Sequence, residues 1–255
     1  MLRNYIPLLL LTLGLSMGIR SLHAQTVEDL DKQADDLVHN LKEEDALQKY
    51  KDVLSLHSDD VHALVGCSDM CARIGNRQTD KGRQKDYFAQ AQSYAGLALQ
   101  ADSNSSDANC VMAIALTRIG QTESGKKKIV LEKDIKLYCD KAIHLNKGNF
   151  MAWYMLGQWD YTISHMSGAE KAGIRVVMGG FPDATIKDAI HCYETCRNLN
   201  RGFILNYLSL AKAYREDDQN ENALSTLQSL VRLPVQTEDD PAIKDEGRKM
   251  LDALM

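Results

Sequence analysis

The sequence predicts an all-α protein, an α-α superhelix of about five helix pairs with long insertions inside the repeats and a C-terminal capping helix. Two observations lead to this fold class. From Thr26 onward, apolar residues recur three and four positions apart, which is the period of one face of an α-helix. A set of packing residues at positions i, i+4 and i+7 also recurs along the chain. Recurrence of one helical pattern indicates stacked repeats that share a continuous core.

The first 24 residues form a predicted signal peptide and are set apart from the fold. Arg3 supplies a positive charge, Ile6–Met17 is a short apolar segment, and Ala24 offers a small residue at the cleavage point. This apolar segment is shorter than the ~20 residues that a membrane-spanning helix needs. We therefore expect an exported, periplasmic protein whose helical-repeat domain covers residues 25–255. A retained N-terminal membrane anchor is the alternative.

The remaining chain divides into predicted helices. Thr26-x-x-Asp29 matches a capping box and begins the first helix, which extends to Leu41 and is followed by a second over Glu43–Leu56. The recurring packing sets identify the second helix of each pair: Ala46/Tyr50/Val53, Ala91/Ala95/Ala98, Ile135/Cys139/Ala142, Ala189/Tyr193/Cys196 and Ala223/Leu227/Leu230. Further first helices are expected at Val61–Ile74, Asp107–Ile119, Phe150–His165 and Phe203–Glu216. Long spacings between the sets predict insertions at Gly75–Gln84, Gly120–Lys127 and Ser164–Thr185, and a polar capping helix is expected at Pro241–Ala253.

Two of the predicted first helices carry a known repeat signature. Met151–Lys171 holds both tryptophans, and its Trp153-x-x-Leu156-Gly157 matches the first helix of a tetratricopeptide repeat. Tyr207–Tyr214 has a similar pattern. The last two packing sets lie 34 residues apart, which is the standard period of this repeat. The array is therefore predicted to be tetratricopeptide-like.

The longest insertion contains a predicted helix of its own. Ser167-x-x-Glu170 is a capping box, which predicts a short extra helix over Gly168–Met178. Gly179–Pro182 would end this helix, and a capping box that starts at Thr185 begins the next one.

The motif around this insertion is more specific than a generic repeat. It consists of Trp153, Leu156, Gly157, Trp159, Ser164, Ser167, Glu170 and Lys171. Further matches are Asp188-Ala189-Ile190-x-x-Tyr193, Asn206-Tyr207-Leu208 and Leu233–Asp240. Over Asp107–Leu254 the chain resembles the tetratricopeptide domain of the regulator of microtubule dynamics family. The resemblance implies the fold and a groove for a peptide or apolar ligand. Some members associate with microtubules, and one resembles a lipid-transfer module. An exported bacterial protein would not meet tubulin, so we do not expect tubulin as a partner.

In this repeat, fixed positions of the first helix line the concave face. Here those positions are Met151, Tyr154, Gln158, Tyr161, Leu205, Leu208, Lys212 and Arg215. They predict a groove with aromatic walls and a cationic end formed by Lys212 and Arg215, suited to an extended peptide or an acidic-headed lipid. The alternative is that the tyrosines and Met151 pack against the inserted helix, because amphipathic helices mostly use such stripes for the core.

No catalytic, metal or cofactor site is predicted. His165 lies near Ser164 and Ser167, but a nucleophile also needs an oriented base and an oxyanion site, and no such motif surrounds it. A zinc site built on His191-Cys192-x-x-x-Cys196 or Cys67-x-x-x-Cys71 would need a second matching pair. Ser164, Ser167 and Glu170 are better explained by helix ends and capping.

Six cysteines in an exported protein invite a disulfide interpretation. The pairs Cys67/Cys71 and Cys192/Cys196 are each four residues apart on predicted helices, where a straight helix does not allow them to bridge easily. We expect the six to be small buried packing residues, although a bond between neighbouring helices stays open.

The net charge of −5 argues against nucleic acid as a partner, because a phosphate-binding surface needs a basic face. Basic clusters at Arg73–Lys85 and Lys126–Lys128 are interpreted as solvated loops. The leading hypothesis is thus an exported, non-enzymatic scaffold that binds an unidentified protein or peptide in its concave groove. Binding or transfer of a lipid in the same groove is the alternative.

Overall fold

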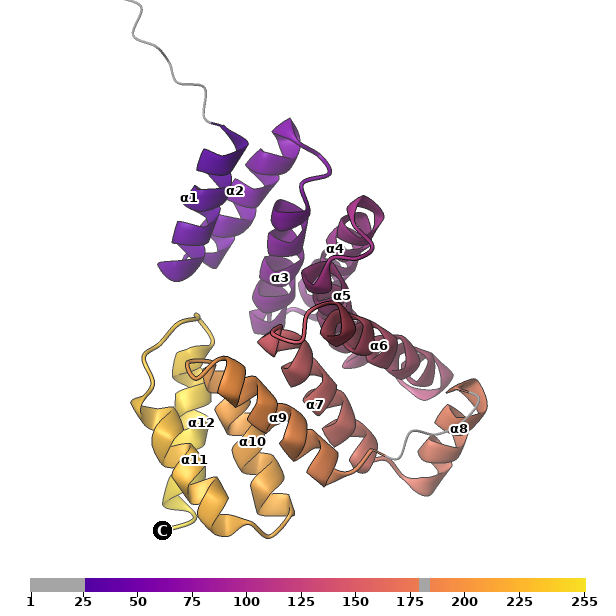
Figure 1. The fold of residues 1–255 in the computed structure, drawn as a ribbon, viewed down its shortest axis with the longest axis vertical. Coiled ribbons are helices and arrows are strands. Elements are labelled where there is room, and N and C mark those ends of the chain that lie inside the picture. The colour runs from indigo at the N-terminus through magenta and orange to yellow at the C-terminus, as the bar shows by residue number, and fades with distance from the viewer. Residues whose placement is uncertain (1–25, 179–183) are drawn as a thin grey trace, which may run out of the picture.

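The computed structural model of the chain describes residues 26–178 and 184–255, which form twelve α-helices (Figure 1). Their bounds are α1 Val27–His39, α2 Glu43–Leu56, α3 Val61–Arg77, α4 Lys81–Ala101, α5 Ser106–Gly120, α6 Gly125–Leu145, α7 Phe150–Ser164, α8 Gly168–Met178, α9 Ile186–Leu199, α10 Ile204–Glu216, α11 Asn220–Arg232 and α12 Asp240–Asp252. The predicted signal peptide and the helix stop at Gly179–Pro182 lie outside the described residues. No helix in the described ranges is long and apolar enough to cross a membrane.

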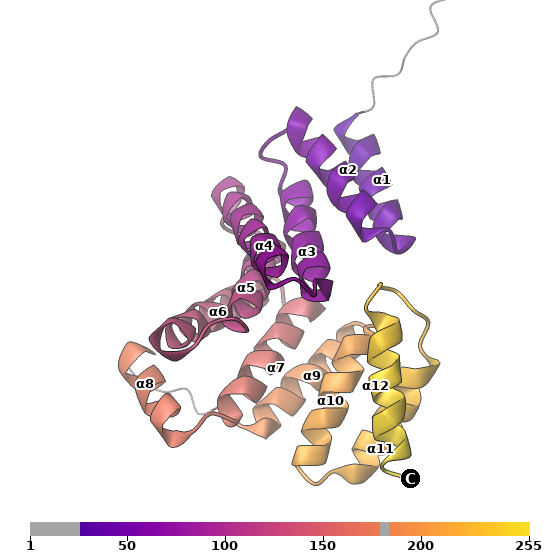
Figure 2. The same ribbon diagram turned by 180° about the vertical axis from the view of Figure 1, so that it is seen from behind.

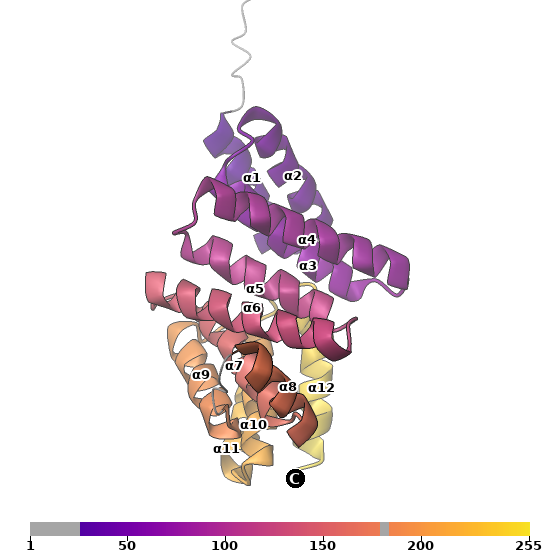
Figure 3. The same cartoon turned by 90° about the vertical axis from the view of Figure 1, so that its right-hand side faces the viewer.

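Successive helices pack in pairs, and the pairs stack into a curved array (Figures 1 and 3). The pairs are α1/α2, α3/α4, α5/α6, α7/α9 and α10/α11, with α12 packed on α10 and α11 at the C-terminal end. The predicted fold class is confirmed. The inserted helix α8 lies against α6 and interrupts the α7/α9 pair only in sequence.

Helix starts follow the predicted capping residues. The Thr26 hydroxyl accepts from the Asp29 N–H at 3.1 Å, and Thr185 and Ser167 accept from the third residue of their own helices at 3.3 Å. In each case the acidic side chain at that third position accepts from the backbone N–H of the capping residue. The three predicted capping boxes are therefore present.

Two of the predicted insertions are helical rather than loop-like. Asp80 caps α4 through the Arg83 N–H at 2.8 Å, so the connection between α3 and α4 is only the short segment 78–80. α6 begins at Gly125, and both α4 and α6 extend over 21 residues. The long spacing between packing sets is taken up by longer second helices, because Lys, Arg and Gln after the cap are good helix formers.

The pairs pack closely because small residues sit where helices cross. A Cβ placed on Gly157 would lie 2.7 Å from Tyr193 Cε1, which is closer than side-chain carbons approach, and 3.1 Å from Cys192 Cβ, which is a tight contact. Tyr193 is itself fully buried, and its hydroxyl accepts from Gln158 at 2.8 Å, so a shift of the ring would break this contact. This explains physically why the first-helix signature has glycine after Leu156.

We expect Gly157→Ala to lower the free energy of unfolding by about 1–3 kcal/mol, because the added methyl group overpacks the α7/α9 contact. Gly96→Ala is the matched control, since a Cβ there would meet its nearest heavy atom only at 4.0 Å. That control should be neutral or stabilising by up to about 1 kcal/mol from helix propensity. Urea unfolding followed by circular dichroism measures both; equal effects would contradict the packing explanation.

All six cysteines are free and buried, as expected. Burial raises the pKa of the Cys71 thiol to about 11 and that of Cys67 to about 12, so both stay protonated at neutral pH.

A cluster of charged residues joins the two ends of the array. We call Glu43, Arg73, Arg77, Glu238 and Asp239 the closure cluster. The fully buried Glu43 carboxylate accepts from Arg73 and, at 2.6 Å, from Arg77, and the Glu43 N–H donates to Glu238 at 3.0 Å. Arg77 also pairs with Glu238 at 3.2 Å and Asp239 at 3.3 Å. The start of α12 is thereby held at the end of α3 (Figures 1 and 2).

The closure cluster corrects one interpretation of the sequence. Arg73 and Arg77 belong to the basic run that was expected to form a solvated loop, yet both lie on α3, with only 16% and 23% of their side chains exposed. Their partners are up to 162 residues away in the chain, beyond the reach of a local charge pattern.

Candidate functional site

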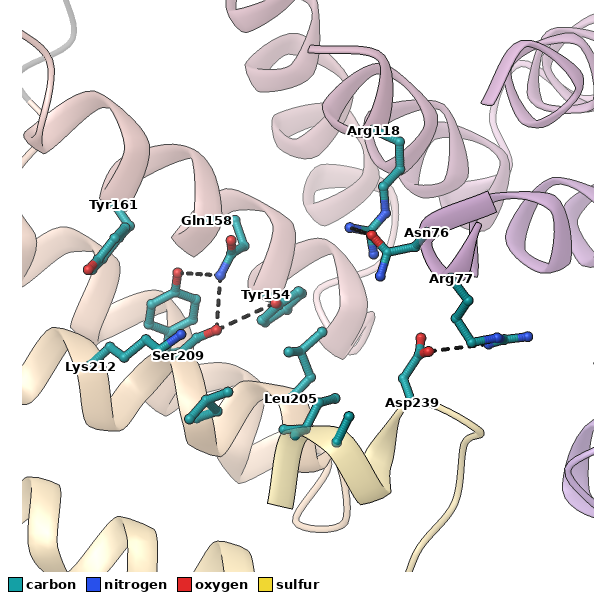
Figure 4. Close-up of a pocket in the computed structure, with 14 residues that line it drawn as sticks. Asn76, Arg77, Arg118, Tyr154, Gln158, Tyr161, Leu205, Ser209, Lys212 and Asp239 are labelled. Atoms are coloured by element: carbon teal, nitrogen blue, oxygen red, sulfur yellow. Dashed lines mark hydrogen bonds and ion pairs between the residues drawn. The ribbon is translucent and has the colours of Figure 1, made fainter. Parts of the chain in front are cut away.

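The closed array encloses a pocket of about 510 Å³ on its concave side (Figure 4). The walls come from α3, α5, α7, α9, α10 and α12. The lining residues are Asn76, Arg77, Arg118, Tyr154, Gln158, Tyr161, Tyr193, Leu205, Leu208, Ser209, Lys212, Asp239, Ala242 and Ile243. Its volume lies in the range of ligand-binding clefts.

The α7 wall consists of Tyr154, Gln158 and Tyr161, which share one face because they are four and three residues apart. The Gln158 amide donates to the Tyr193 hydroxyl at 2.8 Å and to Ser209 Oγ at 3.0 Å. Tyr154 packs edge-on against Phe203 with ring centroids 5.0 Å apart. Burial raises the pKa of Tyr154 to about 12, so its hydroxyl stays protonated. These contacts hold the wall in place before any ligand arrives.

Six of the eight residues expected on the concave face line this pocket: Tyr154, Gln158, Tyr161, Leu205, Leu208 and Lys212. Met151 lies instead beside a smaller adjoining cavity of about 110 Å³, and Arg215 is exposed and outside the pocket lining. The alternative of packing against the inserted helix does not describe these side chains, since α8 contacts α6. Their binding role stays a prediction.

The expected cationic end is placed differently in the structure. Lys212 Nζ pairs with Glu246 Oε1 on α12 at 2.7 Å, so its charge is largely offset within the protein. Arg77, which also lines the pocket, is paired within the closure cluster, whereas Arg118 on the opposite wall has no ion pair among the described residues (Figure 4). Lys212 and Arg215 therefore do not form a joint cationic end.

Arg118 was missed by the sequence reasoning. It is the last charged residue of α5, it lines both the main pocket and the adjoining cavity, and it donates to Asn76 Oδ1 at 3.0 Å. Among the described residues no carboxylate lies within ion-pair distance, because Asp69 pairs with Arg73 and Asp239 pairs with Arg77. Burial lowers the pKa of Arg118, but a guanidinium remains charged. In the sequence, Arg118 could have been noticed as a single arginine within the mostly apolar stretch that forms α5.

His165 forms a helix end rather than a catalytic base. Its Nδ1 lies 3.1 Å from Ser164 Oγ and its Nε2 lies 2.6 Å from Glu216. However, Nδ1 also lies 2.7 Å from the Tyr161 carbonyl oxygen, so both ring nitrogens face acceptor oxygens, Nε2 that of Glu216 and Nδ1 that of Tyr161. Ser164 Oγ donates to the same carbonyl at 2.8 Å. The hydroxyl proton of Ser164 is thus directed at the carbonyl oxygen and not at the imidazole.

The other motif residues have structural roles. Ser167 and Glu170 cap α8, Lys171 donates to the Ser164 carbonyl at 3.3 Å, and Leu156 packs against the core. The Trp153 indole donates to the Lys147 carbonyl at 3.0 Å. In the part of the chain that the structure describes, no group of three or more His, Cys, Asp or Glu residues is arranged to hold a metal ion.

The stacked helix pairs and the concave pocket define a tetratricopeptide-like helical-repeat protein. A family model described as "Regulator of microtubule dynamics protein 1-3" matches residues 30–255. The chain belongs to this family.

Individual relatives are distant. Mouse regulator of microtubule dynamics protein 1 is 27% identical over 89% of this chain and 75% of its own length. Bovine protein 3 is 26% identical over 70% of this chain, and human protein 2 is 29% identical over 56% of it. The chain spans only 37% of the bovine and 35% of the human protein.

Solved structures agree on the fold. A tetratricopeptide protein of Thermus thermophilus superimposes with a TM-score of 0.63 over 89% of this chain and 99% of its own, at 11% identity. Human IFIT1 superimposes with a TM-score of 0.52 over 90% of this chain and 57% of its own, at 16% identity. At such identities the likeness concerns the fold alone.

Proposed function

We propose that the protein is a non-catalytic interaction scaffold whose concave pocket binds a segment of a partner protein through a carboxylate. The observation that carries this proposal is Arg118, a guanidinium that faces the pocket without an acidic partner among the described residues. The fold and family support a protein-binding role.

The remaining walls suit an extended segment rather than a flat surface. Leu205, Leu208 and Ile243 offer apolar contacts on the side of α10 and α12. Tyr154 and Tyr161 offer aromatic faces with hydroxyl groups on α7. An acidic side chain or a C-terminal carboxylate would pair bidentately with Arg118, which is the geometry that guanidinium groups favour.

We expect Arg118→Gln to weaken binding of an acidic peptide roughly 10- to 100-fold, because it removes a charge-assisted hydrogen-bonded pair. The probe is a fluorescent peptide selected from a displayed library against the wild-type protein, and the readout is fluorescence anisotropy. Arg215→Gln is the matched control, since it removes the same charge from the next turn beyond Lys212, outside the pocket lining. An equal loss of peptide affinity in both variants, or no loss in either, would contradict the proposal.

A lipid in the same pocket is the second candidate, favoured by the apolar wall beside Arg118. Native mass spectrometry of the purified protein separates the two. A copurifying lipid that is lost on Leu208→Glu supports the lipid role, whereas an empty pocket across several preparations supports the peptide. With either ligand, we propose no role for this chain in microtubule dynamics, the process for which its relatives are named.

We further propose that the protein is exported and that residues 1–24 are removed, on the basis of the N-terminal pattern alone. N-terminal sequencing of the protein from its native source tests this. A mature chain that starts at or near Gln25 is expected; retention of Met1 would support the anchored alternative.

A further inference from the structure

A separate cavity, of about 180 Å³, lies between α5, α6 and α7 and shares Gln158 with the main pocket. Its only charged lining residues within the described part of the chain are Glu132 and Lys128, both on α6. No residue of the closure cluster and none of the motif residues except Trp159 lines it. The proposed carboxylate site does not use this cavity.

Glu132 is a buried carboxyl group that lacks a partner. The residue is 5% exposed, and among the described residues the charge of Lys128 is the one side-chain interaction that acts on its carboxyl group, with no hydrogen bond to it. Lys128 lines the same cavity one turn earlier, and its charge acts on Glu132 without forming an ion pair. The backbone of Glu132 is held in place, because its carbonyl accepts from the Trp159 indole at 2.8 Å. Burying a carboxylate without a partner is costly, so a buried carboxyl usually has one.

The polar groups around Glu132 are also arranged as acceptors. Thr117 and Thr162 each donate their only hydroxyl proton to a carbonyl oxygen one turn earlier, at 2.8 Å, so their oxygens can only accept further bonds. Gln158 has committed its amide nitrogen to Tyr193 and Ser209, which leaves its amide oxygen as an acceptor (Figure 4). Acceptors from three helices therefore line this cavity together with a carboxyl group, and the donors of Thr117, Thr162 and Gln158 are engaged elsewhere; Lys128 and Gln121 are the lining residues whose side chains can still donate.

We propose that this cavity binds a cationic group, a primary ammonium or a guanidinium, which pairs with Glu132 and donates to Thr117, Thr162 and Gln158. Three or more N–H donors on one cation match this set of acceptors. Where this cation belongs to the partner segment proposed for the main pocket, the inference rests on the proposed function. That segment would then carry a basic residue beside its acidic one.

The Glu132 carboxyl group is suited to change its protonation state when the cavity is filled. Burial raises its pKa to about 7, whereas the charge of Lys128 lowers it only in part. No titratable group on α5 or α7 lines the cavity within the described residues. The carboxyl group is thus largely neutral below pH 7 when the cavity is empty, and a bound cation would favour its ionised form and release a proton.

The test uses n-butylammonium, which represents a lysine side chain, and 1-pentanol as its neutral counterpart of similar size. The chain has two tryptophans, so the indole N–H signals in a nitrogen-15 NMR spectrum are a ready readout. Butylammonium is expected to shift the Trp159 signal in a saturable way, because that N–H is bonded to the Glu132 carbonyl. The Trp153 signal serves as the internal reference, since its N–H is bonded to Lys147.

Glu132→Gln keeps the shape of the side chain and removes its charge, so the saturable shift should disappear. This variant is expected to fold, and to unfold at a higher urea concentration than the wild type at pH 8. A carboxyl group with a raised folded-state pKa costs stability as pH rises from about 4.5 to about 7, and glutamine has no such cost. Thr162→Val, which removes one acceptor and keeps the charge, should weaken the shift without abolishing it.

Several outcomes would overturn the proposal: no saturable shift with butylammonium, an equal shift with pentanol, or an unchanged shift in Glu132→Gln. Arg118→Gln should leave the butylammonium response intact. A failure of the cation site is therefore distinguishable from a failure of the carboxylate site in the main pocket.

Discussion

Replacing Glu43 by alanine is expected to lower the free energy of unfolding by about 3–5 kcal/mol, one of the two largest effects that we predict for a single substitution. The Glu43 side chain is completely buried, and its two carboxylate oxygens accept from Arg73 and Arg77. Removing the carboxylate takes away the buried anion that Arg73 and Arg77 share and leaves them only their more exposed partners, Asp69, Glu238 and Asp239. Like charges at short range in a poorly solvated site are costly, so the loss exceeds that of a surface ion pair.

The neighbouring residue provides the control. Glu44 is 62% exposed and lies 3.9 Å from Arg77, so Glu44→Ala should change the stability by less than about 0.5 kcal/mol. Urea unfolding of the two variants and the wild type, at low and moderate salt, measures the difference. A Glu43→Ala protein as stable as Glu44→Ala would show that the closure cluster does not hold the array together.

Trp159→Ala is the second substitution with a large expected effect, again about 3–5 kcal/mol. The Trp159 side chain is only 2% exposed, its indole donates to the Glu132 carbonyl at 2.8 Å, and Lys136 Nζ lies 5.2 Å from the ring centre. Alanine would leave a cavity between α6 and α7 and remove the hydrogen bond that links the two helices. Both consequences destabilise the stacking of the α5/α6 pair on the α7/α9 pair.

The other tryptophan of the same helix separates this effect from a loss of helix propensity. Trp153 is only partly buried, and its indole donates to the exposed Lys147 carbonyl. Trp153→Ala should therefore cost less than half as much as Trp159→Ala. Circular dichroism is the suitable probe, because each variant retains only one tryptophan. A larger loss for Trp153 would contradict the assignment of Trp159 as the central packing residue.

The concave face shows how far repeat spacing alone can predict a site. Tyr154, Gln158 and Tyr161 follow from their distance to Trp153, because a helix repeats its faces every three or four residues. Met151 and Arg215 obey the same spacing but fall outside the pocket, Met151 beside the adjoining cavity and Arg215 on the exposed surface. Spacing therefore predicts a face, but not where that face becomes a cavity.

Repeat spacing could not identify Arg118 and Glu132 as candidate site residues. Both are single charged residues whose significance depends on which carboxylates or cations surround them. Asp69 and Asp239 are engaged by other arginines, and only that competition leaves Arg118 without a partner. Lys128 lies one turn from Glu132 in sequence, where a helical ion pair would have been expected, yet the two do not pair.

The helices, their capping residues, their pairing and the repeat class follow from the amino-acid sequence alone, because they depend on contacts between residues a few positions apart or on one recurring pattern. Closure of the array emerges only in the folded molecule, since Arg77 meets Asp239 across 162 residues. Closure turns a concave face into a pocket and sets which charges are neutralised. Whether a buried charge has a partner is a property of the assembled fold, and it is this property that identifies Arg118 and Glu132.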